Sequence, residues 1–429
     1  MYYRITNCLQ VTFGLTLGLC FLLLTTPGAA AEKSKDTSTR KKSSKTRYSV
    51  TLAAKLDPET ATATLSLKIK QSRALLRELS LSAPKGQFRN FASEDADVTH
   101  NDDRVTWQVP KKGGTLTWTA ALNIPRGNSW DARITDQWAL LRFEDLLPRL
   151  RTTKLKGSTN TFRLLLDLPE GWTAETRYGR YTGESLRVKS SPQSFRRPTG
   201  WLVAGSLGVR RDKISKRDIT VAAPKGSGFP RVPILAMLNW TLPELVKVFP
   251  NTPERVLIVS GDRSMWRGAL SGPDSLYLHP DRPLISENGT STLLHEIVHL
   301  ATRWFAAPGD DWIVEGLAEY YSLEILRRSG GLSMGRYEGA LEGLADWSKE
   351  NKGGLTDPSK GPDTAYAVGM FAEIADEIGH DNLDAVVDHL TDKEGAQEVS
   401  RAMLAACIED VTGKPSIVLK NALKTVKSN

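Results

Sequence analysis

Cysteine is scarce in this chain of 429 residues, which contains only Cys8, Cys20 and Cys407. The first two lie in an N-terminal segment that we expect to be removed, so the mature protein would keep one thiol. One thiol excludes an internal disulfide, and the protein must be stabilised by its core, which a chain of this length allows. Cys407 lies in an apolar stretch, residues 403–408, which predicts a buried structural thiol.

The body of the chain also lacks a strong net charge. The formal net charge is +8, but residues 32–47 contain seven basic residues against two acidic ones, and Arg4 adds another basic residue. Residues 48–429 therefore have a formal net charge of only +2. This low charge argues against a nucleic-acid-binding groove. Hydrophobic residues make up 40% of the chain and charged residues 25%. These ordinary values exclude disordered and fibrous classes for most of the chain.

The N-terminus has the pattern of a signal peptide. Arg4 precedes an apolar stretch from about residue 11 to residue 24, and the small residues 28–31 follow. This pattern predicts a signal peptide over residues 1–31 and an exported protein that is periplasmic or secreted, as in a bacterial envelope. An uncleaved membrane anchor is the alternative, although the apolar stretch is short for a membrane span.

A basic segment of low complexity follows the signal peptide. Residues 32–47 are rich in Ser, Thr and Lys and show no apolar periodicity, which predicts a disordered linker. Weak contact with an anionic envelope or membrane surface is a function that such a run of charge could have.

Residues 48–223 are predicted to form a β-rich N-terminal domain. Short runs alternate apolar and polar residues, and turn sequences such as residues 84–86 and 169–171 separate them. Many short strands with this punctuation are typical of an antiparallel β-sandwich. The expected strands are 48–56, 61–69, 105–109, 115–122, 162–168, 201–207 and 219–222.

From residue 224 to residue 429 the apolar spacing becomes helical. Two short strand-like runs, residues 256–259 and 276–278, interrupt this region. After an apolar helical pattern over 235–248, helices are expected at 291–305, 312–328, 334–350, 364–379, 381–391, 394–411 and 415–427. The fold class is therefore predicted to be α+β, with a β-sandwich followed by a mostly helical catalytic domain.

Two of the six histidines occur in the sequence His295-Glu296-x-x-His299. Residues four apart project from one face of a helix, so both imidazoles can bind one zinc ion. Glu296 would then act as the general base on a water molecule activated by the metal. Two ordinary histidines on a helix are the alternative, which this spacing around a glutamate disfavours.

A catalytic zinc site needs a third protein ligand and keeps one position open. Glu315 opens the next helical stretch, and its apolar neighbours indicate a buried position rather than a solvated carboxylate. A helix that turns back would bring Glu315 to the metal, and Gly316 would allow close packing against a neighbouring helix. Glu319 lies one turn later and could accept a hydrogen bond from a ligating histidine, or it could be a surface acid.

These motifs together resemble the gluzincins, the thermolysin-like zinc metallopeptidases, in which a Glu on the following helix completes the zinc site. The resemblance is closest to the glycyl aminopeptidase family and related peptidase-MA-like proteins, and it covers most of residues 48–390. It implies a thermolysin-like peptidase domain. The segments that carry it are His295-Glu296-x-x-His299, Trp312-x-x-Glu315-Gly316-x-Ala318-x-Tyr320, Tyr48-Ser49-Val50 and residues 166–172.

The same resemblance implies a further catalytic residue and reveals a departure. Tyr366, in a Tyr-x-x-Gly sequence ending at Gly369, would donate a hydrogen bond to the oxyanion; a core tyrosine is the alternative. Aminopeptidases of this clan also carry a Glu that anchors the substrate's α-amine. The corresponding stretch, residues 267–274, contains no Glu, and Asp274 is a weak substitute. Aminopeptidase and endopeptidase activity therefore both stay open.

The predicted function is zinc-dependent hydrolysis of a peptide bond in a peptide or protein substrate. A non-catalytic peptide-binding or assembly factor that keeps the metal site is the alternative, and the missing Glu favours it. A hydrolase of another acyl or amide bond is a third interpretation.

Overall fold

A computed structural model describes residues 46–426, apart from residues 85, 189–194, 196, 350–354 and 392–395. The predicted signal peptide and all but the last two residues of the predicted linker lie outside the described residues. Within the described ranges, no helix has both the length and the apolar character needed to cross a membrane.

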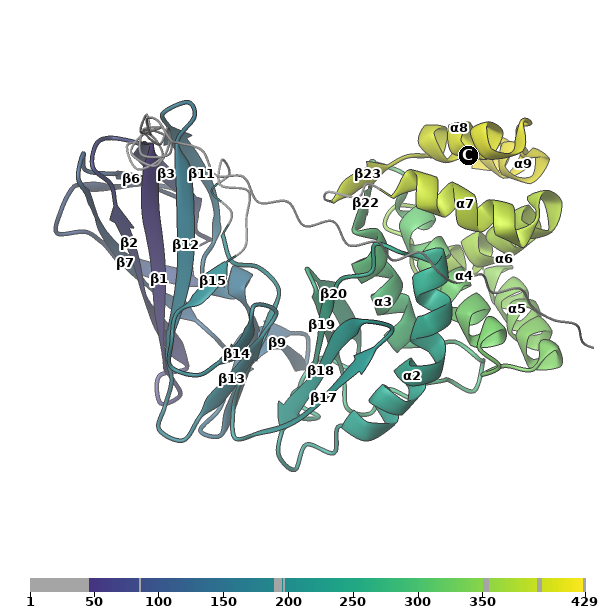
Figure 1. Ribbon diagram of the computed structural model, residues 1–429, viewed down its shortest axis with the longest axis horizontal. Helices are drawn as coiled ribbons and strands as arrows, with labels where there is room; N and C mark the ends of the chain where they lie inside the picture. Colours follow the sequence, from purple (N-terminus) through teal and green to yellow (C-terminus); the bar gives the residue numbers. More distant parts are fainter. Residues whose placement is uncertain are drawn as a thin grey trace, which may run out of the picture. The chain divides into compact units, whose positions relative to one another are not determined.

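The first half of the described chain forms three β-sheets (Figure 1). The first sheet has the strand order β15–β12–β1–β2–β7–β4. Its strands are β1 Arg47–Asp57, β2 Thr62–Lys70, β4 Phe88–Ala92, β7 Gly113–Ala121, β12 Thr159–Asp167 and β15 Leu186–Val188. The prediction of a purely antiparallel arrangement is wrong for this sheet, because β1 pairs with β12 in parallel, from Arg47 opposite Thr159 onward. These two strands lie a hundred residues apart, and the pairing depends on long-range contacts.

The other two sheets of this half complete its core. One has the order β14–β13–β16–β10–β9–β8, and the other has the order β11–β3–β6–β5. The strands are β3 Leu76–Ser82, β5 Val98–Asn101, β6 Arg104–Gln108, β8 Ile124–Arg126, β9 Ser129–Ile134, β10 Trp138–Arg142, β11 Arg149–Lys154, β13 Thr173–Thr176, β14 Gly179–Tyr181 and β16 Trp201–Gly205, and a short 3-10 helix, η1, spans Phe143–Asp145. Alternate residues of these strands point inward, and all three sheets contribute to one apolar core around Trp107 and Trp118.

A fourth sheet belongs with the helices. Its order is β17–β18–β19–β21–β20, and β20 is an edge strand. Its strands are β17 Leu207–Ile214, β18 Arg217–Pro224, β19 Arg255–Val259, β20 Ala269–Gly272 and β21 Ser275–Leu278. The sequence pattern placed residues 219–222 with the N-terminal strands, whereas β18 pairs in parallel with β19. Strand β20 was not among the expected strands, because Gly268, Gly272 and Pro273 leave residues 267–274 without a clear apolar alternation.

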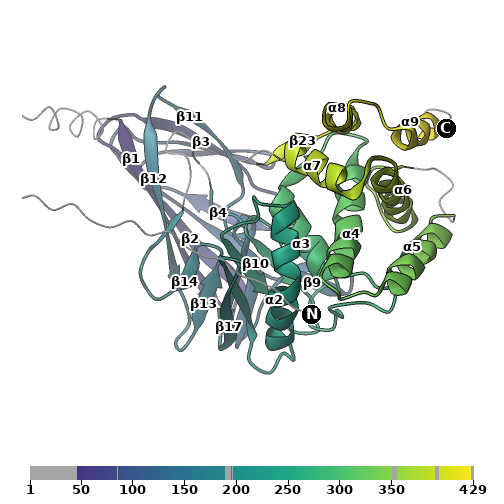
Figure 2. The same cartoon turned by 45° about the vertical axis from the view of Figure 1, so that its right-hand side comes forward.

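Helices make up most of the second half (Figures 1 and 2). They are α2 Arg231–Val248, α3 Thr292–Thr302, α4 Asp311–Arg328, α5 Met334–Ser348, α6 Pro362–Ile378, α7 His380–Leu390, α8 Arg401–Thr412 and α9 Ile417–Val426. The expected helices are therefore confirmed within a few residues, except that α8 begins later than predicted. Residues 397–399 form a short strand, β23, which pairs with β22 (Trp304–Ala306).

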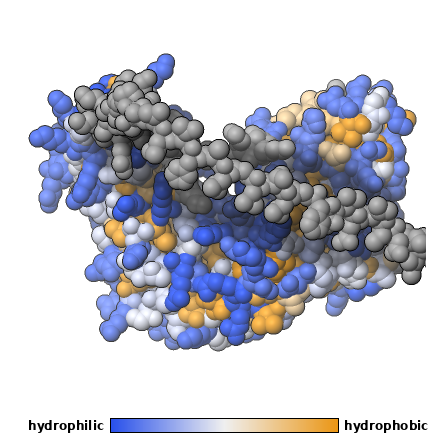
Figure 3. All heavy atoms as spheres, viewed as in Figure 1, coloured by the Kyte–Doolittle hydropathy of each residue, from blue (hydrophilic) through white to orange (hydrophobic). Residues whose placement is uncertain are grey.

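Most apolar side chains of the described residues are buried. Most of the coloured surface in Figure 3 is hydrophilic, with apolar residues in separate patches. Cys407 is half-buried rather than buried, and it packs against the edge of the helical core.

Candidate metal centre

Helix α3 carries both histidines and has well-defined ends. Ser291 caps its N-terminus, because its hydroxyl accepts a hydrogen bond from the Leu294 backbone N–H. The helix ends at Arg303, which adopts the left-handed conformation at φ 55°. The chain then continues directly into β22, so α3 is shorter than the predicted 291–305.

Each of the two helices at the site has one stripe that is not fully buried. In α3 this stripe consists of Thr292, His295 and His299, and all other residues of the helix are buried. In the first four turns of α4 it consists of Asp311, Glu315 and Glu319. A spacing of three or four residues places each set on one helix face, and the two stripes meet in the structure.

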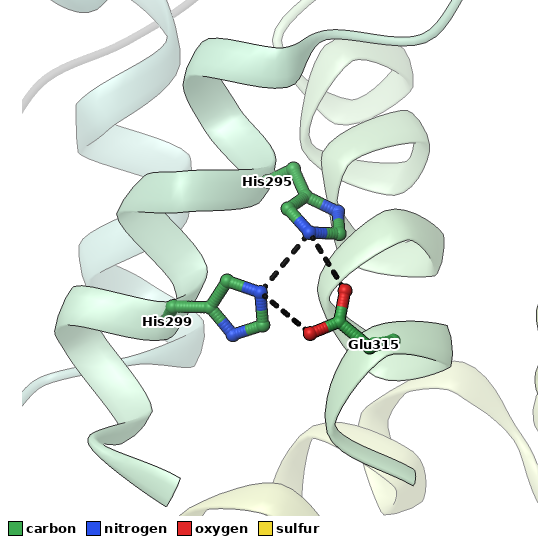
Figure 4. A group of neighbouring side chains, drawn as sticks. All are labelled: His295, His299 and Glu315. Carbon is green, nitrogen blue, oxygen red and sulfur yellow. Dashed lines mark hydrogen bonds and ion pairs between the residues drawn. The ribbon is translucent and has the colours of Figure 1, made fainter. Parts of the chain in front are cut away.

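The structure brings His295, His299 and Glu315 together (Figure 4). One ligand atom from each residue lies within 4.8 Å of the others. The two Nε2 atoms are 3.0 Å apart, and the Glu315 carboxylate oxygens lie 3.3 Å from His295 Nε2 and 3.6 Å from His299 Nε2. Figure 4 shows the three side chains pointing toward one another from two helices.

Glu319 makes the contact that the sequence analysis expected. His295 Nδ1–H donates to the Glu319 carboxylate at 2.8 Å. This contact fixes the ring orientation and leaves Nε2 directed at His299 and Glu315. Glu319 therefore positions a side chain of the group without joining it.

The histidines have opposite electrostatic environments. Burial and the neighbouring His295 lower the pKa of His299 to about 4, so its imidazole is neutral at pH 7 and available as a ligand. Burial also opposes protonation of His295, but hydrogen bonds to Glu315 and Glu319 outweigh it and raise its pKa well above the usual value. Binding of a metal ion at this site would therefore displace a proton.

Glu296 is buried beside the group, with 7% of its surface exposed. Burial raises the pKa of its carboxyl, and hydrogen bonds from the side chain and backbone of Ser271 partly offset this. Ser271 belongs to β20, so the edge strand and α3 together hold Glu296. A carboxylate with a raised pKa is better suited to accept and return a proton near neutral pH.

Tyr366 is not brought to this group. Its side chain lines a separate cavity of about 360 Å³ between α5, α6 and α9, together with residues such as Ser348, Glu373 and Val418. The helix was predicted correctly, but Tyr366 faces α5 and α9, whereas Ala367 and Phe371 of α6 face α4. The face that a helical tyrosine presents depends on which neighbours pack around it, and a motif does not contain that information.

The donor set fits a metal ion. Two imidazole nitrogens and a carboxylate oxygen from two helices converge on one point, and the second nitrogen of His295 is already occupied by Glu319. Three such donors with an open position are the pattern of catalytic zinc sites. These residues could therefore hold a divalent metal ion.

A cavity of about 710 Å³ adjoins the group at His299. Its walls come from β20, from the residues that follow α3 and from the β-rich half of the chain. Among the described residues, four arginines line it together with one carboxylate, that of Asp274; the arginines are Arg149, Arg177, Arg197 and Arg303. Sequence reasoning missed these arginines because they are scattered over 155 positions and only the fold brings them together.

Asp274 is not free to bind an amine. Both Arg177 and Arg303 form ion pairs with its carboxylate. The weak substitute that the sequence suggested for the missing Glu is therefore already engaged by two guanidinium groups.

Comparisons with known proteins bear on the fold. The sequence matches no protein-family model and no curated protein. Among solved structures, the chain is similar to an aminopeptidase N family protein from Idiomarina loihiensis, with a TM-score of 0.61 and 14% sequence identity. The match covers 88% of this chain and 75% of that chain. This protein thus has a peptidase-like fold, in which a β-rich part is followed by a helical part.

Proposed function

We propose that this protein is a gluzincin-type zinc metallopeptidase that hydrolyses peptide bonds. The observation that carries the proposal is the convergence of His295, His299 and Glu315, with Glu296 buried beside them. The similarity of fold to an aminopeptidase N family protein supports it.

The roles follow from the positions of the side chains. His295, His299 and Glu315 would hold zinc, which when bound would supply Lewis-acid activation of water and of the scissile carbonyl. Glu296 takes a proton from the attacking water and hands it to the leaving amine. Glu319 keeps the His295 ring in the required orientation. Tyr366 has no part in this proposal, because it lines the cavity between α5, α6 and α9.

Strand β20 gives the substrate a place to bind. It is the last strand of its sheet, and its residues Ser271 and Gly272 line the cavity beside His299. An extended peptide can add to an exposed strand edge through main-chain hydrogen bonds. Because Glu296 contacts Ser271, a peptide on this edge would lie close to the general base.

We also propose that the protein acts after export, on the basis of the signal-peptide pattern in residues 1–31. Loss of the protein from the exported fraction when residues 1–31 are deleted would test this, and unchanged export would contradict it.

The decisive experiment combines metal analysis with hydrolysis of a peptide library. We expect the purified protein to contain one zinc per chain and to cleave peptides in a chelator-sensitive manner. The Glu296→Gln variant should keep its zinc and lose at least about 10²-fold in turnover, since general-base catalysis contributes about 10²–10⁴-fold.

A matched control is Glu342→Gln, which removes an exposed carboxylate on α5 and should leave turnover unchanged. Undiminished hydrolysis by the Glu296→Gln variant would contradict the role of Glu296 as the general base. Zinc binding without hydrolysis of any peptide would favour the non-catalytic binding factor instead.

A further inference from the structure

Among the described residues that line the cavity there are four arginines and one carboxylate, that of Asp274, and the carboxylates of Glu144 and Asp145 act on Arg197 from nearby. Asp274 pairs with Arg177 and Arg303. Arg197 donates a hydrogen bond to the Leu147 carbonyl at 2.7 Å. No ion pair to Arg149 occurs within the described part of the chain, and its side chain is exposed on β11. Among the described residues that line the cavity, guanidinium groups therefore outnumber carboxylates.

Two of these guanidinium groups also repel each other. Burial lowers the pKa of Arg197; Glu144 opposes this, and the charge of Arg149 adds to it. Like charges gathered in a concave surface with weakly polarisable walls raise the local concentration of anions. An anionic group entering the cavity would relieve this repulsion.

A second feature of the same wall lacks a partner. Trp304 lines the cavity, is 9% exposed, and its indole N–H makes no hydrogen bond among the described residues. This nitrogen atom is itself covered by the protein, so a ligand in the cavity would contact other atoms of the Trp304 ring. Trp304 follows Arg303 directly, and Arg303 lies one turn after His299, so both are fixed relative to the metal centre.

We propose that this cavity binds a carboxylate group of the peptide substrate, with Arg149 as the main specificity-determining residue and Arg303 and Arg197 beside it. The inference rests on the proposed peptidase function, because the peptide is taken to lie along β20. The carboxylate can come from a free C-terminus or from an acidic side chain. Guanidinium groups bind both through paired N–H donors.

Binding to the zinc-loaded Glu296→Gln protein tests the proposal without turnover. The probes are N-acetylated pentapeptides in two arms: a C-terminal acid against the corresponding amide, and an internal Glu against Gln in an amidated peptide. Titration calorimetry would measure the affinities. In at least one arm, the anionic peptide should bind at least about tenfold more tightly than its neutral partner, as for a hydrogen bond to a charged group.

Replacing Arg149 by Gln in the same background should reduce this difference to less than about twofold, because the exposed guanidinium is removed and the fold is kept. Arg149→Lys should restore part of it. Arg151→Gln is the matched control, since Arg151 is exposed on the same strand and does not line the cavity; it should leave the difference intact.

Three outcomes would overturn the proposal: equal binding of anionic and neutral peptides, no binding of either, or a preference that survives Arg149→Gln. These are separable from failure of the proposed function. Chelator-sensitive cleavage of neutral peptides with no charge preference would keep the peptidase and remove the carboxylate site. A preference for anionic peptides without any cleavage by the wild-type protein would keep the carboxylate site and remove the peptidase function.

Discussion

At the residue scale, the centre consists of polar side chains that satisfy one another. His295 contacts both Glu315 and Glu319, and His299 contacts His295 and Glu315. Half-buried polar groups cost free energy unless they are paired. Removing any one of them leaves a neighbour without its partner, so even a residue outside the ligand set should influence metal binding.

Glu319→Ala tests this dependence. The variant loses the acceptor for His295 Nδ1–H, so the ring is no longer held in one orientation, and zinc affinity should fall by about 10–100-fold. Competition with a chromophoric chelator measures the affinity. Glu342→Ala, on the exposed face of α5, serves as the control. An unchanged affinity in Glu319→Ala would mean that Glu319 is an ordinary surface acid.

At the scale of the elements, α4 packs closely on α6 at Gly316. A Cβ atom added at Gly316 would lie 2.5 Å from the Ala367 Cβ and 3.1 Å from the Phe371 ring. The sequence indicated that Gly316 permits close helix packing, and the structure identifies α6 as the partner. A glycine is required at position 316 because α4 and α6 approach each other too closely there for a Cβ atom.

Gly316→Ala should therefore destabilise the protein by about 1–3 kcal/mol, the usual cost of overpacking, and weaken zinc binding because Glu315 is the adjacent residue. Thermal unfolding and chelator competition measure the two effects. Gly369→Ala is the matched control on α6, where an added Cβ has nothing within 4 Å, and it should be neutral or stabilising by up to about 1 kcal/mol. Equal effects of the two substitutions would contradict the packing argument.

Helix α9 is held at its N-terminus by a carboxylate from α6. Glu377 accepts hydrogen bonds from the Ser416 hydroxyl and from the backbone N–H groups of Ile417 and Val418. Although burial opposes it, the Ser416 contact and these N–H groups lower the pKa of Glu377 below its usual value. The ionised form therefore binds the helix end more strongly than the protonated form does.

Ionisation of Glu377 therefore makes a pH-dependent contribution to the stability of α9, and the sign of this contribution is known. Because the folded pKa is lowered, the stabilisation is fully present above the unfolded pKa of about 4.3 and is lost as the pH falls through the folded value. Glu377→Gln should speed amide hydrogen exchange in α9 at pH 7, by an amount corresponding to about 0.5–1 kcal/mol. The difference from the wild type should vanish at acidic pH, and a difference that persists there would contradict the assignment.

At the scale of the whole molecule, the described residues between 46 and 426 form one compact unit. Trp201 of β16 is central to the cluster that joins the β-rich half to the fourth sheet, with 1% of its surface exposed. Its indole N–H donates to the Leu270 carbonyl, and its backbone N–H donates to the Ser275 hydroxyl. The same contacts anchor β20 and β21, and β20 forms part of the wall of the arginine-lined cavity.

Trp201→Ala should lower stability by about 3–5 kcal/mol, the usual cost of removing a buried Trp. It should also weaken peptide binding by the Glu296→Gln protein, because β20 loses its support. Calorimetry and titration measure these changes. Trp347→Ala, where 44% of the side chain is exposed, should change stability by less than about 0.5 kcal/mol. Unchanged peptide binding in Trp201→Ala would contradict the idea that the Trp201 contacts support the peptide-binding cavity.

The sequence by itself determined the local features of this protein. Helices α3 and α4 follow from apolar spacing, and the positions of His295, His299, Glu315 and Glu319 on those helices follow from intervals of four residues. These features depend on residues within one or two helical turns, where backbone geometry alone sets which side chains are neighbours.

Only the tertiary structure decided the rest. The parallel pairing of β1 with β12, the packing of α6 that sets the face of Tyr366, and the placing of Arg149 and Arg303 around one cavity all involve segments that are distant in the chain. Such contacts depend on which surfaces pack against each other, and no short stretch of sequence encodes that choice. The spacing of the side chains on each helix of the centre is therefore local in origin, whereas the meeting of α3 with α4 and the cavity beside them depend on the tertiary fold.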